Sequence, residues 1–63
     1  MSNAVVTNKQ QIISLEDFAD LLDASTVESV LDLGGTILHR VLHPVMGALV
    51  LVNTTSLNAY MAL

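Results

Sequence analysis

The pattern of apolar and polar positions along the chain predicts a helix first. Residues 1–13 show no helical period and begin with small polar groups, so we expect them to form a flexible arm. From Ser14 onward, apolar residues recur at helical spacing: Leu15, Phe18, Ala19 and Leu22. Ser14 is a suitable N-terminal cap, and Asp17 stands three residues further on. The pattern therefore predicts a helix over residues 15–24.

Two further short helices are predicted before Pro44. Ser25 and Glu28 repeat the capping pattern, and an apolar stripe follows up to Gly34, which predicts a helix over residues 26–33. Thr36 can cap a third segment, whose apolar face extends until Pro44 disturbs it. That face consists of Ile37, Leu38, Val41, Leu42 and Val45. The predicted fold class is mostly α, with short helices in residues 15–43.

The apolar C-terminal segment allows two structures. Residues 45–52 form a continuous apolar run, residues 53–56 (NTTS) form a turn-like polar patch, and residues 57–63 are apolar again. One possibility is a hairpin of buried strands around NTTS. The other is a single helix that starts at Pro44, which we favour because no glycine follows NTTS and Ala, Leu and Met dominate. In both cases so short a chain has no independent large core.

Charge divides the chain at Gly34-Gly35. The formal net charge is −4, and the only Lys and Arg residues are Lys9 and Arg40. All acidic residues precede the glycine pair: Glu16, Asp17, Asp20, Asp23, Glu28 and Asp32. We therefore distinguish the arm (1–13), an acidic segment (14–35) and an apolar segment (36–63). Two basic residues are too few to neutralise phosphates, which excludes nucleic acid as a partner.

The N-terminus has neither a basic start nor a long apolar stretch, so the chain is expected to be cytoplasmic at synthesis. Residues 41–52 are uncharged but too few to span a bilayer as a helix. Membrane contact through residues 41–63 stays an alternative, whereas packing of this segment against protein is favoured. The mature form would then be exported, or associated with a membrane or an assembly.

Catalytic and metal chemistry finds little support. The absence of cysteine excludes disulfides and thiolate metal sites. His39 and His43 would share one helix face, but two ligands do not make a site, so we interpret them as solvent or interface residues. The acids on the first helix are interpreted as a solvated face rather than paired catalytic carboxylates. We expect no enzyme, no metal and no cofactor.

The twin glycines and the hydroxyl cluster remain as candidate features. Gly34-Gly35 lacks the lysine and the glycine spacing of a phosphate-binding loop. It is therefore interpreted either as a helix cap with a flexible joint or as a cleavage point. The hydroxyls of Thr54, Thr55 and Ser56 have no neighbouring base in the sequence, so a turn is favoured over a nucleophile, and they remain candidate substrates of a modifying enzyme.

The acidic segment reads as a capped acidic helix that ends in Ser29-Val30-Leu31-Asp32-Leu33-Gly34-Gly35 and is followed by an acid-free apolar segment. This pattern resembles the double-glycine leader of ribosomally made, post-translationally modified peptide precursors, which include bacteriocins. Glu28 stands eight residues before the junction, where such leaders often carry an acid, whereas Asp32 and Ser29 depart from the aliphatic pattern of the family. The resemblance implies that a processing enzyme or exporter binds the leader and that a peptidase cuts after Gly35.

Three function classes follow. The first is a precursor of a modified or exported hydrophobic peptide; the second is a small structural or assembly subunit of a virion, filament or membrane complex; the third is a regulatory binding module. In each, the partner is another protein or a copy of the same chain. The candidate partner-binding residues are Leu15, Phe18, Leu22, Val27 and Leu31, and the candidate processing residues are Gly34 and Gly35.

Overall fold

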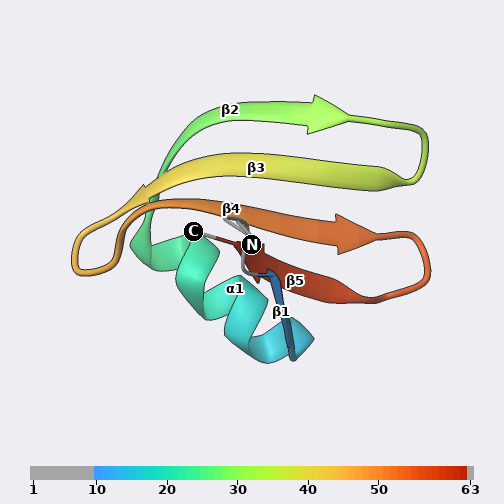
Figure 1. Cartoon of the computed structure of the whole chain (residues 1–63), viewed down its shortest axis with the longest axis horizontal. Coiled ribbons are helices and arrows are strands. Elements are labelled where there is room, and N and C mark those ends of the chain that lie inside the picture. Colours follow the sequence, from blue (N-terminus) through green and yellow to red (C-terminus); the bar gives the residue numbers. More distant parts are fainter. Residues whose placement is uncertain (1–9, 63) are drawn as a thin grey trace, which may run out of the picture.

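A computed structural model describes residues 10–62 and contains one antiparallel sheet and one helix (Figure 1). The elements in chain order are β1 (Gln10–Ile13), α1 (Leu15–Ala24), β2 (Thr26–Asp32), β3 (Thr36–His43), β4 (Gly47–Thr54) and β5 (Ala59–Ala62). The five strands lie in the order β1-β5-β4-β3-β2, so β4 is central and β1 and β2 are the edges. All neighbouring pairs are antiparallel.

The predicted mostly α fold class is wrong. Residues 26–33 and 36–43, which we expected to be helices, form β2 and β3 with their short turn. Both segments are rich in Val, Leu, Ile and Thr, and helices of about two turns are too short to persist alone in water. For the C-terminal segment the hairpin alternative is correct, because β4 and β5 pair around the NTTS patch, and the single helix from Pro44 is wrong.

The first predicted helix is confirmed with its bounds. In α1 the backbone N–H of Asp17 donates a hydrogen bond to Oγ of Ser14 at 3.0 Å, as the capping pattern requires. Glu16 and Asp17 lie in the first turn, where acidic groups stabilise the helix dipole. The helix ends at Ser25, whose backbone is extended and whose hydroxyl donates to the carbonyl of Leu21 at 2.7 Å.

The paired glycines form the turn between β2 and β3 rather than a helix cap. Gly34 and Gly35 have φ angles of +67° and +103°, and Leu33 N–H donates to the carbonyl of Thr36 at 2.8 Å. A two-residue loop with both φ angles positive matches the twist of the flanking strands and strongly favours glycine. The side chain of Asp32 accepts a hydrogen bond from Gly34 N–H at 3.0 Å, which further fixes the turn.

The helix packs on one face of the sheet, which we call the helix side. Val41, Leu49 and Leu51 lie beneath it and are almost completely buried. Phe18, Leu21, Leu22 and Met61 pack against them from both layers. The turns that join β2 to β3 and β4 to β5 lie at the end of the sheet that projects past the helix (Figure 1). Within residues 10–62, no helix is long and apolar enough to cross a bilayer.

A strained residue in the turn between β4 and β5 gives the first prediction. Leu57 has a φ angle of +64°, which costs an L-residue with a side chain about 1–2 kcal/mol, and its side chain is 72% exposed. Leu57→Gly should therefore raise the free energy of unfolding by roughly 0.5–1 kcal/mol, measured by urea denaturation. Val45→Gly is the control, because Val45 is also exposed in a turn but its φ is not positive. Equal effects of the two substitutions would contradict this account.

Candidate interaction surface

The face of the sheet opposite the helix, which we call the open face, carries an unbroken row of apolar side chains. Alternate residues of a strand point to opposite faces, so strand register determines which residues share one. Leu31 pairs with Leu38, Leu38 with Val52, Val52 with Tyr60, and Tyr60 with Ile12. None of these residues belongs to the helix-side core. The row therefore crosses all five strands without a charged side chain.

The neighbouring rows of the open face are smaller or more polar. One row contains Ser29, Arg40, Val50, Ala62 and Gln10, and the next contains Thr26, Leu42 and Ala48. Beyond the apolar row, Thr36 pairs with Thr54. Among the described residues of these rows, Arg40 is the only charged one. These rows therefore have an apolar centre with a single cation beside it.

Among residues 10–62, no helix or loop covers the open face. At its edges Ile12 is 82% and Leu31 54% exposed, while Leu38, Val50 and Tyr60 are partly exposed. Only Val52, at the centre of the row, is buried by its neighbours in the sheet. An antiparallel sheet with one face in water normally alternates apolar and polar positions, and a contiguous exposed apolar patch marks an interaction site.

Most of the negative charge of the described residues lies away from the open face. The acids of α1 are all exposed: Glu16, Asp17, Asp20 and Asp23. On β2, Asp32 pairs with Ile37 on the helix side, whereas Glu28 lies in the bulge between Val27 and Ser29, where alternation from Val27 places it on the open face at the β2 edge. Among the described residues, the helix side therefore carries the four acids of α1 and Asp32, and the open face carries only Glu28 and Arg40, both near its β2 edge.

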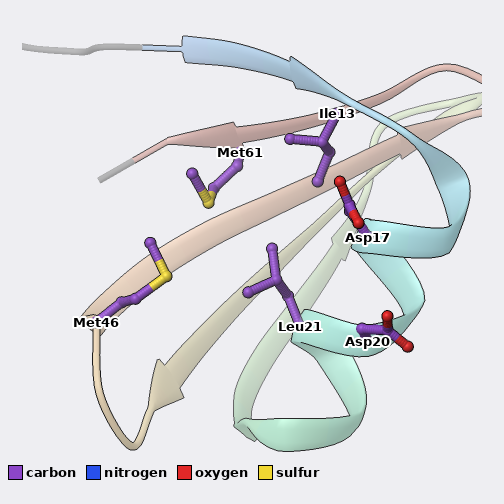
Figure 2. A pocket seen from close by; sticks show the side chains of 6 residues that line it. All are labelled: Ile13, Asp17, Asp20, Leu21, Met46 and Met61. Carbon is purple, nitrogen blue, oxygen red and sulfur yellow. The ribbon is translucent and has the colours of Figure 1, made fainter.

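A groove of about 320 Å³ lies on the helix side (Figure 2). Its apolar lining comes from Ile13, Leu21, Met46 and Met61, which point toward one another from β1, α1, the turn before β4, and β5. Asp17 and Asp20 lie at its helix border, and in Figure 2 Asp20 points away from the apolar side chains. The groove is open to solvent and lacks a buried polar group that could orient a small ligand.

The two histidines do not share a helix face, because residues 36–43 are a strand. Four residues along a strand span about 13 Å, too far for two imidazoles to bind one metal ion. Nδ1 of His39 lies 3.2 Å from the carbonyl oxygen of Leu51. The rings of His39 and Phe18 are in edge-to-face contact, with 5.5 Å between their centroids. Nδ1 of His43 accepts hydrogen bonds from Val45 and Met46 N–H, both at 3.1 Å. Both histidines thus have structural contacts.

The predicted partner-binding residues do not lie together on one surface. Phe18 and Leu22 pack against the helix-side core, and Leu15 lies at the start of α1 with 44% of its surface exposed. Val27 pairs with Val41 on the helix side, whereas Leu31 lies in the apolar row of the open face. Of the predicted set, only Leu31 therefore belongs to the open face.

The hydroxyl cluster and the candidate processing residues lie at one end of the sheet. Thr55 N–H donates to the carbonyl of Gly35 at 2.9 Å, so the turn after β4 is tied to the turn after β2. Oγ1 of Thr54 accepts a hydrogen bond from Asn58 N–H at 3.3 Å. Thr55 and Ser56 are exposed, and a Cβ atom added to Gly34 would meet no neighbouring atom within 4 Å. Gly34, Gly35, Thr55 and Ser56 lie in turns, whereas Thr54, which we also expected in a turn, is the last residue of β4.

Sequence reasoning missed most of the open face, namely Ile12, Leu38, Val50, Val52 and Tyr60. Their signal is alternation: every second residue of 48–52 and of 60–62 belongs to the open face. The signal is hidden because the intervening residues of β4 are equally apolar, so the segment reads as a continuous apolar run.

The described residues contain no group of three or more His, Asp or Glu side chains that could hold a metal ion. Comparisons with protein-family models, curated proteins and solved structures found no match to this chain. The assignment of a function therefore depends on the geometry of the surfaces described above.

The turn between β3 and β4 gives the second prediction. There the side chain of His43 accepts hydrogen bonds from two backbone N–H groups, as Asn and Asp side chains do when they stabilise turns. His43→Ala should lower the free energy of unfolding by about 1 kcal/mol, because two turn donors lose their protein acceptor. His43→Asn should lower it by less, since its side-chain oxygen can accept in place of Nδ1. Urea denaturation of the two variants measures the difference; an equal loss in both would contradict the capping role.

Proposed function

We propose that this protein is a small, non-enzymatic structural or assembly subunit that buries its open face against another protein surface. The observation that carries the proposal is the apolar row that crosses all five strands on a face that no described element covers. A helix–sheet layer with two apolar sheet faces is stable in water only when the second face is also covered.

The small size of the core supports the same function. Within the described residues the buried apolar side chains are those of Val41, Leu49, Leu51, Val52 and Ala59. A single core in so short a chain contributes only a few kcal/mol of net stability, and small domains without disulfides or metals commonly gain the rest from a partner. Contact through the open face would bury Leu31, Leu38 and Tyr60 as well.

The precursor peptide is the competing candidate. Its support is that Gly34 lies in an exposed turn with open space on the side where a Cβ would stand, and that glycines suit a narrow peptidase channel. Cleavage after Gly35, however, would separate β2 from β3, and β3 pairs with β2 along most of its length. The structural subunit needs no such cut and uses the sheet intact.

Solvent access to Tyr60 tests the proposed function. Hydroxyl-radical footprinting should label Tyr60 in the purified protein, diluted until it is monomeric, and label it several-fold less in extracts of the cells that make it. Met46 is the internal control, because it is 43% exposed in a turn away from the open face and should react equally in both samples. Equal labelling of Tyr60 in both samples, with Met46 unchanged, would disprove burial of the open face.

Intact mass distinguishes the subunit from the precursor. The proposed function predicts that the chain persists at its full mass of 6.7 kDa in the assembled material. The precursor hypothesis predicts a product that begins at Thr36, with or without further mass shifts on Thr54, Thr55 and Ser56. Mass spectrometry of material isolated without protease treatment measures this, and a dominant peptide starting at Thr36 would favour the precursor.

A further inference from the structure

We infer that the partner on the open face is a second copy of this chain, so that two copies form a two-fold symmetric sandwich in the layer order helix, sheet, sheet, helix. This inference deepens the proposed function and depends on it. It is carried by three observations: the size of the face, the placement of charge, and the self-complementarity of the apolar row.

The open face is large enough for a stable dimer. The protein measures 38 × 28 × 21 Å, and Figure 1, which looks along the shortest axis, shows the strands side by side in the plane of the two longer dimensions. An interface of standard size buries about 800 Å² on each partner. The open face spans five strands, of which β2, β3 and β4 have 7, 8 and 8 residues and are about 23–26 Å long, so it is of the order of size that such an interface needs. The 21 Å thickness is that of one helix layer and one sheet layer.

The charges permit two copies to meet at this face. The chain carries a net charge of −4, so most contacts between copies bring like charges together. Contact through the open faces avoids this, because the four acids of α1 then lie in the two outer layers of the sandwich. Glu28, in the bulge at the β2 edge, is the one described acid that alternation places on the open face, and in the sandwich β2 meets β1 of the other copy, which has no acidic residue. Two sheets and two helix layers therefore separate the acidic surfaces.

The apolar row is complementary to itself about β4. A two-fold axis parallel to β4 places Val52 on Val52, Leu38 opposite Tyr60, and Leu31 opposite Ile12 of the other copy, because the row is centred on the middle strand. Sheets that pack face to face in this way lie about 10 Å apart with their side chains interdigitated. Each large side chain thus meets an apolar residue of the other copy.

Arg40 favours the same orientation. Its row places Ala62 at the equivalent distance on the other side of β4, so the two-fold axis brings the long side chain of Arg40 over a small residue. The apolar stem of arginine can cover such a residue while its guanidinium reaches solvent at the rim. A packing of β3 directly on β3 would instead bring the two guanidinium groups against each other. The apolar row and the cation thus favour one arrangement.

A matched pair of substitutions on β2 tests the inference. Val30 and Leu31 are adjacent and 55% and 54% exposed, but Val30 pairs with His39 on the helix side and Leu31 lies on the open face. Sedimentation velocity of the purified full chain over a concentration series should show a monomer–dimer equilibrium. Leu31→Lys should raise its dissociation constant about tenfold or more, since a buried leucine is replaced by a charge in each copy. Val30→Lys should leave it within about twofold.

Every outcome of these measurements either supports or overturns the sandwich. A dimer weakened by Leu31→Lys and not by Val30→Lys supports the sandwich, as does a still larger loss with Leu38→Lys at the centre of the face. Circular dichroism establishes that the variants are folded; if Leu38→Lys unfolds, the β2 pair remains decisive. Equal weakening by both β2 variants, or insensitivity to both, overturns the sandwich because the contact then lies elsewhere. A monomer up to the solubility limit, or a monomer that binds zwitterionic lipid vesicles instead, also overturns it.

Failure of the sandwich and failure of the proposed function give different results. If the purified chain stays monomeric while Tyr60 is protected in cell extracts, the open face binds a different protein and the structural-subunit function stands. If Tyr60 is labelled equally in both samples, the open face is not buried in the cell and both inferences fail.

Discussion

One helix of ten residues has to cover a five-stranded sheet that is apolar on both faces. At about 1.5 Å per residue the helix is roughly 15 Å long, whereas the protein extends over 38 × 28 Å. It therefore buries Val41, Leu49 and Leu51 on one side and leaves the other side open. Within residues 10–62, one apolar face of the sheet therefore stays uncovered.

The turns make this sheet possible in so short a chain. Each pair from β2 to β5 is joined by a short connection, so the sheet is a meander of local hairpins with little loop-closure cost. Gly34 and Gly35 supply the positive φ angles of the first hairpin, and His43 caps the second. The hydrogen bond from Thr55 to Gly35 joins the first and third turns at one end of the sheet.

The separation of charge follows from the same arrangement. Before Gly34 the chain contributes the helix and both edge strands, β1 and β2, and the acids lie at or near α1 and β2, which have solvent-facing sides. After Gly35 it contributes β3, β4 and β5, whose central strand has neighbours on both sides and apolar side chains on both faces. The asymmetry at the glycine pair thus marks the passage from the periphery of the sheet to its centre. In the sandwich that we propose, the acidic periphery stays outside and the apolar centre becomes a second core.

The sequence by itself determined the local features whose cause is local. The α1 helix begins at Leu15 because Ser14 and Asp17 form a cap within one turn, and both were readable from their spacing. The charge boundary at the glycine pair and the shortage of core for so small a chain were readable as well. Only the tertiary structure decided that β2, β3, β4 and β5 are strands. Apolar runs such as those of β3 and β4 are compatible with a helix or a strand, and pairing with neighbouring strands decides between them. The open face likewise exists only through register, because Leu31, Leu38, Val52, Tyr60 and Ile12 come from five separate segments that hydrogen bonding between strands aligns.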